Sequence, residues 1–580
     1  MPSFDQLGKQ AVRQTRMLKV MAASGVIRPY GPRKLLGIAT TLSRRGIGFA
    51  GGMGALAVRS GDDVGLIDEL GQLTWREVDE RATRLARGLH GVGVSEGDSV
   101  AVLCRNHRYF VDVSTALSKL GADILYLNTA FSAPQLAEVC KREKPVAIVF
   151  DEEFTELVDK SEVDLTRVVA WHDGDAGDVT LVEDLIEKAS TEDVAVPDHT
   201  TRPVILTSGT TGTPKGAPRD EAGLDGAVAL LSRMPLKTGG RTFIVAPLFH
   251  TWGWAHLNLA MLLGSTLVLR RKFDPADALA TLREHECDAM VVIPVMLQRI
   301  MKLDESEREG DWSFLKVVAA SGSALPGDLA SDWMDAFGEN LYNTYGSTEV
   351  AWATIAQPQD MRDAPGTAGK PPYNTVVKIY DEDGNPVEQG ESGRIFVGNT
   401  MLFGGYTGDT DEKKDMIDGL MSSGDVGRFD EEGRLFVEGR DDEMIVSGGE
   451  NVFPQEVEDC LSRHEAVSDV AAIGVDDDDY GTRLRAFVVT SGDVDEDTLK
   501  SHVKDNLARY KVPREIVFLD ELPRNATGKI LKKDLKDYDA DGNPGSGSSS
   551  DDDAADGGDG SADGSANGGG DGGGEDEQAS

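Results

Sequence analysis

A short run of hydroxyl side chains, glycines and one lysine is the strongest chemical signal in the sequence. It reads Thr207-Ser208-Gly209-Thr210-Thr211-Gly212-Thr213-Pro214-Lys215-Gly216 and follows Val204-Ile205-Leu206, an apolar run typical of a buried strand. Glycines let the backbone turn its N–H groups toward an anion, and the hydroxyls and Lys215 add donors. The run is therefore predicted to hold phosphate groups. It differs from the common P-loop, in which Gly-Lys-Ser/Thr opens a helix.

Further polar motifs follow this loop in order along the chain. They are Pro247-Leu248-Phe249-His250, Ser321-Gly322-Ser323-Ala324, Asn343-Thr344-Tyr345-Gly346-Ser347-Thr348-Glu349, Ser423-Gly424-Asp425, Gly439-Arg440-Asp441-Asp442, Ser447-Gly448-Gly449-Glu450 and Thr527-Gly528-Lys529. The set resembles the motifs of the adenylate-forming superfamily, which includes acyl-CoA synthetases, luciferases and peptide-synthetase adenylation domains. The resemblance covers about residues 65–537. One departure is Ala217-Pro218 after Lys215-Gly216, where many members carry a Ser/Thr-His pair.

The resemblance implies an ATP site. Tyr345 can stack on adenine, Thr348 can donate to the α-phosphate, and Glu349 supplies a hard carboxylate oxygen for Mg²⁺. Asp425 can accept hydrogen bonds from both ribose hydroxyls. Arg440 matches a ribose-binding arginine. The expected nucleotide-binding set is completed by Thr207, Ser208, Gly209, Thr210, Thr211, Gly212, Lys215, Ser323, Ala324, Asn343, Thr344 and Gly346.

The same resemblance implies a two-step reaction that consumes ATP and coenzyme A. A carboxylate is ionised at neutral pH, so its attack on the α-phosphate needs no base. The phosphate loop, Mg²⁺ on Glu349 and Lys529 would neutralise the transition state, with Thr348 and His250 completing the expected catalytic set. The thiol of coenzyme A then attacks the acyl-adenylate. Asp442 matches a hinge about which a small domain rotates, and this rotation replaces Lys529 by Gly448 and Gly449, which line the coenzyme A passage.

The acyl group is expected to bind next to an uncharged stretch. No Asp, Glu, Lys or Arg occurs between Arg241 and Arg270, and within it Phe249 and Trp254 match the acyl pocket and the tunnel gate of long-chain acyl-CoA synthetases. A medium- or long-chain fatty acid is therefore the expected substrate. An aryl or short acid, with the aromatic residues packed as core, is one alternative, and a ligase that loads a carrier protein is another. Outside the family, the alternatives are a nucleotide-binding protein without catalysis and a membrane scaffold.

Two other functions of the uncharged stretch are disfavoured. The stretch is long enough to cross a membrane, but Pro247, Gly253, Gly264 and two histidines argue for a strand, a loop and a buried helix. The spacing of His250 and His256 fits no zinc motif.

Strands and helices alternate between residues 65 and 150, which predicts a largely parallel sheet covered on both faces. The expected fold class is α/β. A large N-terminal domain contains stacked mixed sheets with helices, and a small mobile C-terminal domain is α+β. The expected boundaries are a basic N-terminal segment at 1–60, an ATP- and acyl-binding domain at 61–441, the mobile domain at 442–538 and an acidic tail at 539–580.

Charge is unevenly distributed over the 580 residues. The net charge is −41, which argues against nucleic acid as a partner and resembles the acidic surfaces of proteins from salt-loving archaea. The tail holds 12 acids and no Lys or Arg, is expected to be disordered, and leaves a net charge of −29 on the rest. Residues 1–60 contain ten basic residues and one acid, Asp5, and predict an amphipathic helix over residues 4–22. That helix packs on its own acidic domain or lies on an anionic membrane.

The four cysteines, Cys104, Cys140, Cys287 and Cys460, are scattered without CxxC spacing. This spacing argues against a disulfide framework or a zinc site and indicates a reducing cytoplasm. Peripheral contact with a membrane through residues 1–60 is compatible with that location.

Overall fold

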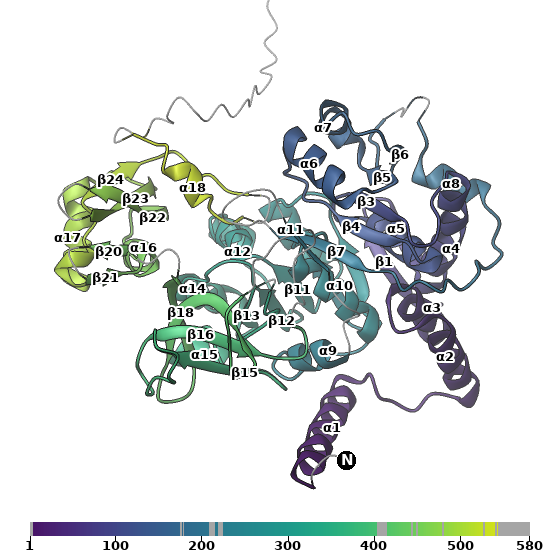
Figure 1. Ribbon diagram of the computed structural model, residues 1–580, viewed down its shortest axis with the longest axis horizontal. Coiled ribbons are helices and arrows are strands. Elements are labelled where there is room, and N and C mark those ends of the chain that lie inside the picture. Colours follow the sequence, from purple (N-terminus) through teal and green to yellow (C-terminus); the bar gives the residue numbers. More distant parts are fainter. Residues whose placement is uncertain are drawn as a thin grey trace, which may run out of the picture.

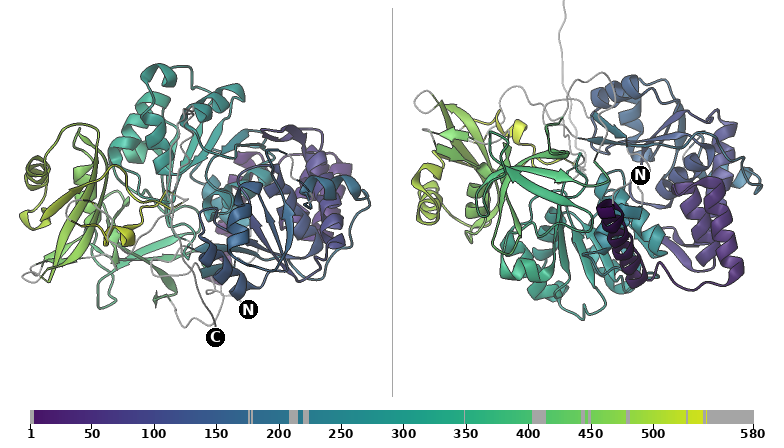
Figure 2. Two further views of the ribbon diagram at one scale, coloured as in Figure 1. Left: turned by 90° about the horizontal axis from the view of Figure 1, so that it is seen from above. Right: turned by 60° about the horizontal axis from the view of Figure 1, so that its bottom comes forward.

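The computed structural model describes most of the chain. The described residues are 4–174, 177, 179–207, 215–218, 224–347, 349–402, 414–441, 445–447, 450–477, 481–525, 528–539 and 542. Two central α/β sheets, an antiparallel sheet and a small C-terminal domain follow one another across the molecule (Figures 1 and 2). The fold class expected from the sequence is confirmed.

The first central sheet has eight strands in the order β14-β13-β12-β11-β9-β10-β1-β2. Its inner pairs are parallel, and only the outer pairs β13/β14 and β1/β2 are antiparallel. The inner strands are almost wholly apolar because helices cover the sheet. The strands are β1 Val64–Asp68, β2 Gly71–Thr74, β9 Arg241–Ile244, β10 Thr266–Leu269, β11 Ala289–Val292, β12 Val317–Ala320, β13 Leu341–Tyr345 and β14 Thr354–Ala356. The helices between them are α10 Thr251–Leu263, α11 Pro275–Glu284, α12 Pro294–Met301, α13 Glu305–Arg308 and α14 Gly327–Phe337.

The second central sheet has six strands in the order β6-β5-β3-β4-β7-β8. It is parallel except for the last pair, β7/β8. The strands are β3 Ser99–Leu103, β4 Asp123–Tyr126, β5 Ala147–Phe150, β6 Thr166–Val169, β7 Pro203–Thr207 and β8 Lys215–Pro218. Its helices are α4 Trp75–Gly91, α5 Arg108–Leu120, α6 Ala133–Glu143, α7 Thr155–Lys160 and α8 Val182–Lys188. The alternating pattern thus forms two sheets, joined by one continuous apolar core.

An antiparallel sheet carries two of the predicted nucleotide residues. Its strands are β15 Val376–Tyr380, β16 Gly393–Gly398, β17 Met416–Ile417, β18 Leu420–Phe429 and β19 Leu435–Arg440, and α15 Pro358–Asp363 precedes them. In the β18/β19 pair, Asp425 lies directly opposite Arg440. The register of this pair therefore brings together two side chains that the sequence separates by fifteen positions.

The C-terminal domain is α+β. It contains β20 Ile445–Ser447, β21 Glu450–Val452, β22 Val467–Asp477, β23 Gly481–Thr490, β24 Glu515–Phe518, α16 Pro454–Leu461, α17 Glu496–Asn506 and α18 Lys532–Leu535. It contacts α12 of the large domain, where Gln298 Nε2 donates to the Ser468 carbonyl at 2.8 Å. The domain boundary predicted at Asp442 lies outside the described residues.

The basic N-terminal segment forms α1 Phe4–Ser24, α2 Pro32–Arg45 and α3 Phe49–Ser60. The predicted helix over residues 4–22 is confirmed, and it packs on α9 Leu224–Leu231. Met21, which is buried, contacts Val228 and Tyr373, and Arg13 pairs with Asp225 at 2.5 Å. The first alternative, packing on its own domain, thus holds for α1.

The uncharged stretch between Arg241 and Arg270 lies inside the large domain. It contains β9, a loop, α10 and also β10, a strand that the sequence analysis did not separate from the helix. Gly264, with φ of 64°, ends α10 in the left-handed conformation and starts the turn into β10. None of the helices that the structure describes is long and apolar enough to cross a membrane.

Candidate active site

A cavity of about 2600 Å³ opens where the large and small domains meet. Its walls include the loops that follow β9, β11, β12 and β13 of the first sheet. These strands are parallel, so their carboxyl ends meet at one edge of the sheet, which is where open α/β sheets bind ligands. The antiparallel sheet and the C-terminal domain supply the remaining walls near Asp425 and Lys529.

Tyr345, Asp425 and Arg440 form a polar cluster on one wall of this cavity. The Tyr345 hydroxyl donates to Asp425 Oδ2 at 2.5 Å and lies 3.1 Å from Ser423 Oγ. Arg440 Nη1 is 3.6 Å from Asp425 Oδ1. Burial raises the pKa of Asp425, and the Tyr345 hydrogen bond and the charges of Arg440 and Lys529 oppose that rise. The cluster places an aromatic ring, a carboxylate and a guanidinium side by side in the cavity wall.

Asn343 and Thr344, at the end of β13, present buried polar atoms without partners. Thr344 Oγ1 and Asn343 Oδ1 make no hydrogen bond to any residue that the structure describes. Ser321 Oγ donates to the Thr344 carbonyl at 2.8 Å and so fixes the loop that contains Ser323 and Ala324 against this strand. Buried polar groups without partners are costly, so these two atoms favour a polar ligand.

A glycine is required where this motif turns. A Cβ on Gly346 would lie 2.2 Å from the Ala351 carbonyl oxygen and 2.7 Å from Trp352 Cα. The chain therefore folds back on itself next to Glu349, and Ser347 Oγ accepts the Glu349 N–H at 3.3 Å. The Glu349 carboxylate lies in the lining of the cavity.

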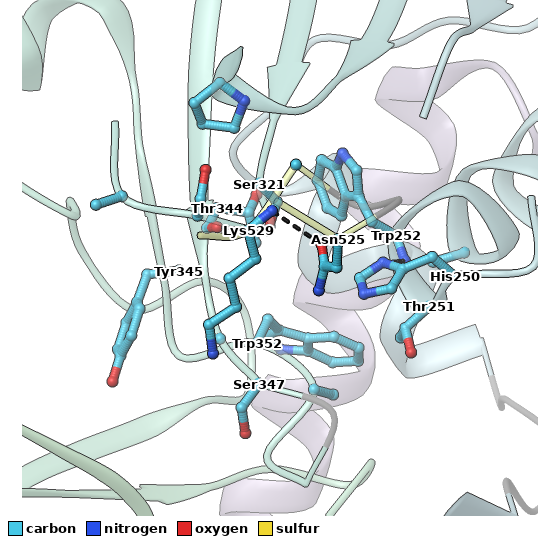
Figure 3. Close-up of a pocket in the computed structure, with 18 of the residues that line it drawn as sticks. His250, Thr251, Trp252, Ser321, Thr344, Tyr345, Ser347, Trp352, Asn525 and Lys529 are labelled. Atoms are coloured by element: carbon cyan, nitrogen blue, oxygen red, sulfur yellow. Dashed lines mark hydrogen bonds between the residues drawn. The ribbon is translucent and has the colours of Figure 1, made fainter. Parts of the chain in front are cut away.

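Lys529 enters the cavity from the C-terminal domain. Its N–H donates to Asn525 Oδ1 at 2.9 Å, and the Asn525 N–H donates back to the Lys529 carbonyl at 2.9 Å. Gly528, with φ of 75°, packs so closely on α12 that a Cβ would lie 2.5 Å from Val295 Cγ1. Figure 3 shows the Lys529 side chain extended between Tyr345 and Trp352. The small domain is thus docked with Lys529 inside the site.

His250 and three aromatic residues form the opposite wall. His250 caps α10, with Nδ1 accepting the Trp252 N–H at 3.4 Å, and removal from water lowers its pKa to about 4. The imidazole is therefore neutral at pH 7. Trp252 is fixed by its indole N–H, which donates to the Val292 carbonyl at 3.1 Å. Phe249 and Trp254 are buried and also belong to the cavity lining.

The cavity continues beyond Trp254 along α10. Its lining includes Ala255, Asn258, Leu259 and Leu262, and it also includes residues 46–50, which are the turn after α2 and the first two residues of α3. The ring centroids of Phe49 and Trp254 are 6.5 Å apart. The N–H of Ala50 donates to Ser118 Oγ at 3.0 Å and holds this turn on α5. The cavity lining thus extends from the polar site along α10, where apolar residues are mixed with polar ones such as Asn258 and Arg45.

The comparisons with known proteins identify the family. The sequence model of the AMP-binding enzyme family matches residues 55–407. The model of the AMP-binding enzyme C-terminal domain matches residues 456–529. The chain belongs to the AMP-binding enzyme family. The adenylate-forming resemblance drawn from the motifs is confirmed at this level.

This AMP-binding enzyme has curated relatives that span its folded part. It is 32% identical to a feruloyl-CoA synthase of an Amycolatopsis species over 471 residues, which are 80% of this chain and 93% of the relative. It is 31% identical to a 2-succinylbenzoate–CoA ligase of Bacillus cereus over 469 residues, with the same shares. These relatives place the chain among the AMP-forming acid–CoA ligases, whose reactants are ATP, coenzyme A and a carboxylic acid.

Solved structures agree with this placement. The crystal structure of the anthranilate CoA ligase AuaEII with anthranoyl-AMP superposes with a TM-score of 0.76 at 25% identity, over 84% of this chain and 96% of that one. The O-succinylbenzoate coenzyme A synthetase of Bacillus subtilis with AMP gives 0.74 at 26% identity, over 84% and 98%. The two-domain fold of the AMP-binding enzyme is therefore that of the ligases.

Several predicted residues lie outside the described part of the chain. They are Ser208, Gly209, Thr210, Thr211, Gly212, Thr348, Asp442, Gly448 and Gly449. Only the backbone is described for Thr207 and Lys215, which pair across β7 and β8. This pair joins the two ends of the predicted phosphate loop at the edge of the second sheet.

The sequence analysis missed three parts of the site. Trp352 lines the cavity and donates through Nε1 to Thr375 Oγ1 at 3.0 Å, and Asn525 orients Lys529. Trp352 and Asn525 each lie a few residues from a predicted motif, and this proximity was the signal that could have identified them. The turn at residues 46–50 had no such signal, because it precedes every motif by more than 150 positions.

One buried group of possible metal ligands lies elsewhere among the described residues. Cys104, His107 and Asp151 approach one another within 4.8 Å. His107 Nε2 is 2.8 Å from one Asp151 oxygen, the other accepts the Arg105 N–H at 2.8 Å, and His107 Nδ1 accepts the Tyr109 N–H. Because these bonds use both His107 nitrogens and both Asp151 oxygens, the group is a structural network.

Proposed function

We propose that this enzyme activates a medium- or long-chain fatty acid as an acyl-adenylate and transfers it to coenzyme A. The observation that supports this proposal most directly is the part of the cavity that follows α10 from His250 past Trp254 to residues 46–50. The thirteen residues from His250 to Leu262 span roughly 18 Å along a helix axis, which exceeds the length of one aromatic ring. No Asp, Glu, Lys or Arg occurs on this helix.

We assign the nucleotide to the polar end of the cavity. Adenine would stack on Tyr345 beside Ser323 and Ala324, with Asn343 Oδ1 and Thr344 Oγ1 receiving polar partners. Asp425 and Arg440 would hold the ribose. The run from Thr207 to Gly212, with Lys215, would hold the β- and γ-phosphates. Gly346 permits the close turn beside them.

The first step forms the acyl-adenylate. A carboxylate oxygen attacks the α-phosphorus, the phosphorus–oxygen bond to pyrophosphate breaks, and pyrophosphate leaves with the electron pair. Lys529 and Thr348 would stabilise the negative charge that builds on the α-phosphate oxygens. Glu349 offers an oxygen ligand to Mg²⁺, which when bound supplies positive charge to the phosphates. Neutral His250 would orient the carboxylate at the cap of α10.

The second step forms the thioester. The thiol of coenzyme A, as thiolate, attacks the acyl carbon, and the bond from that carbon to the AMP oxygen breaks. We assign Asp442 as the hinge that withdraws Lys529, and Gly448 and Gly449 as the passage for the pantetheine arm. A reducing cytoplasm fits the four cysteines, all of which are buried and free of disulfides.

A ladder of acids tests the substrate class. ATP–pyrophosphate exchange measured from acetate to palmitate should rise with chain length, because each buried methylene stabilises binding by up to ~0.8 kcal/mol. Exchange that peaks at acetate or benzoate and falls from hexanoate onward would refute it. Replacing coenzyme A by a carrier protein in the full reaction tests the alternative acceptor.

An aryl acid is the second candidate. The relatives named above act on feruloyl, succinylbenzoate or anthraniloyl groups, and Thr251 Oγ1 has no hydrogen-bond partner among the described residues. This hydroxyl, from a residue of the cavity lining, would suit the hydroxyl or methoxy group of a substituted ring. Adding ferulate and benzoate to the ladder separates the two candidates.

A further inference from the structure

Helix α2 exposes an apolar stripe on a protein with a strongly acidic composition. All fourteen residues of the helix are described and none is buried. Leu35 is 50% exposed and Leu36 is 70% exposed, and Ile47, in the turn that follows, is 55% exposed. Helical spacing places Leu35, Leu36 and Ala39 on one face. This face is without a partner in the described part of the chain.

The opposite face of α2 is already used. A Cβ on Gly37 would lie 2.8 Å from Val58 of α3, and a Cβ on Gly54 would lie 2.8 Å from the methyl group of Thr41. Lys34 Nζ donates to the Arg59 carbonyl at 2.8 Å. These contacts fix α2 on α3, and Figure 1 shows both helices at the edge of the large domain. The apolar stripe lies on the side of α2 opposite to these contacts.

Basic residues border the stripe. Arg33 and Arg44 lie on α2 and Arg28 just before it, and all three are exposed. Residues 1–60 carry ten basic side chains against one acid, whereas the whole chain has a net charge of −41. An apolar stripe with basic borders is typical of helices that lie in the surface of an anionic membrane.

We infer that the outer face of α2 docks on an anionic lipid bilayer. Fourteen residues are too few to span a membrane, so the helix would lie in the interfacial plane. The acidic tail at 539–580 is another candidate to cover the stripe, because its negative charge complements the basic residues beside α2. It contains no large apolar side chain that could cover Leu35 and Leu36. A second copy of the chain could offer its own α2 stripe, but it also brings a net charge of −41, and repulsion between two such chains opposes their pairing.

Docking would also place the bilayer next to the acyl cavity. Arg44 and Arg45, the last two residues of α2, line the cavity together with residues 46–50, which follow directly. A fatty acid dissolved in the bilayer would then reach the cavity without crossing bulk water. This consequence rests on the proposed function, whereas docking itself does not.

Vesicle sedimentation of the full chain tests the inference. The probes are vesicles of phosphatidylcholine with phosphatidylglycerol and vesicles of phosphatidylcholine alone. The protein should pellet with the first and much less with the second. Leu36→Glu should weaken binding roughly tenfold or more, because it removes a leucine that docking would bury in the bilayer and adds a negative charge that anionic lipids repel. Arg33→Gln should weaken it about fivefold, and rising KCl should weaken the wild type.

Leu70→Glu is the matched control. Leu70 is 51% exposed in the turn between β1 and β2, so the change of chemistry and charge is the same away from α2. It should bind as the wild type does. Equal binding of the wild type and Leu36→Glu to anionic vesicles would overturn the inference. So would a wild-type dimer, seen by sedimentation velocity, that Leu36→Glu converts to a monomer.

Exchange activity with a water-soluble acid separates this inference from the proposed function. Leu36→Glu should retain it, because Leu36 lies outside the cavity. An enzyme inactive on every fatty acid that still binds vesicles through α2 would refute the proposed substrate class and leave docking intact.

Discussion

Replacing Lys529 with alanine should slow acyl-adenylate formation by about 10²–10³ and spare thioester formation. Lys529 is the side chain that the C-terminal domain extends between Tyr345 and Trp352 (Figure 3). A positive charge about 4 Å from a phosphate oxygen contributes on the order of 4 kcal/mol at an effective dielectric constant near 20. The side chain is exposed, so water screens part of this energy, and the loss of a single donor to a developing oxyanion costs about 10²–10³ in rate.

The two half-reactions are measured separately. ATP–pyrophosphate exchange reports adenylation, and pre-made acyl-adenylate with coenzyme A reports thioester formation. The matched control is Lys500→Ala on α17 of the same domain, which removes the same charge from a lysine that pairs with Glu496 at 2.8 Å. Lys500 is absent from the cavity lining, so this variant should retain both half-reactions.

Two results would refute this reasoning. If Lys529→Ala slows both half-reactions equally in a folded protein, Lys529 has no role specific to adenylation. If exchange falls less than tenfold, the orientation in which the small domain places Lys529 inside the site is not the adenylating one. Asn525→Ala provides a second check, because loss of its hydrogen bond to the Lys529 N–H should lower exchange in the same direction by a smaller factor.

Four further expectations follow from the same geometry and composition. Asp442→Pro should lock the hinge, because proline fixes φ near about −65°, so one half-reaction should survive while the other fails. Trp254→Ala should shift the chain-length profile and leave the KM for ATP unchanged. The melting temperature should climb with KCl toward molar concentrations, since the chain without its tail carries −29; a flat dependence would contradict this. Burial lowers the pKa of His256 to about 4, from an ordinary value of about 6.5. The free energy of unfolding should therefore fall by up to about 3 kcal/mol as the pH drops from about 6.5 toward 4. His256→Gln should reduce that loss, measured by urea denaturation at each pH.

Local signals in the sequence predicted the elements and the residue types of the site. Such signals are visible at two helix starts: Pro454 occupies the first position of α16, and Thr74 with Glu77 forms a capping box before α4. The motif residues after β12 and β13 lie at the carboxyl ends of parallel strands, where open α/β sheets bind ligands. That they meet was implied by the family resemblance and not by the periodicity of the sequence.

The division into two sheets could not be predicted in this way. Periodicity shows that a segment is a buried strand, but it carries no information about which strand lies beside it. The chain leaves the first sheet after β2, builds all six strands of the second, and returns at β9, whose neighbour β10 pairs with β1. That pairing joins Leu66 to Leu267, and only packing of the complete chain determines it.

The far wall of the acyl cavity depends on contacts at still greater separation. Arg59 donates to the Leu262 carbonyl at 2.8 Å, and the Ala50 N–H donates to Ser118 Oγ, so α3 is fixed against α10 and α5 by polar bonds that local sequence does not encode. The family model begins at residue 55, so Phe49 belongs to a part of the chain outside the matched region. Relatives that share the matched region need not share this wall. The substrates of those relatives therefore say least about the part of the cavity next to Phe49. The acid ladder tests directly which acid this part accepts.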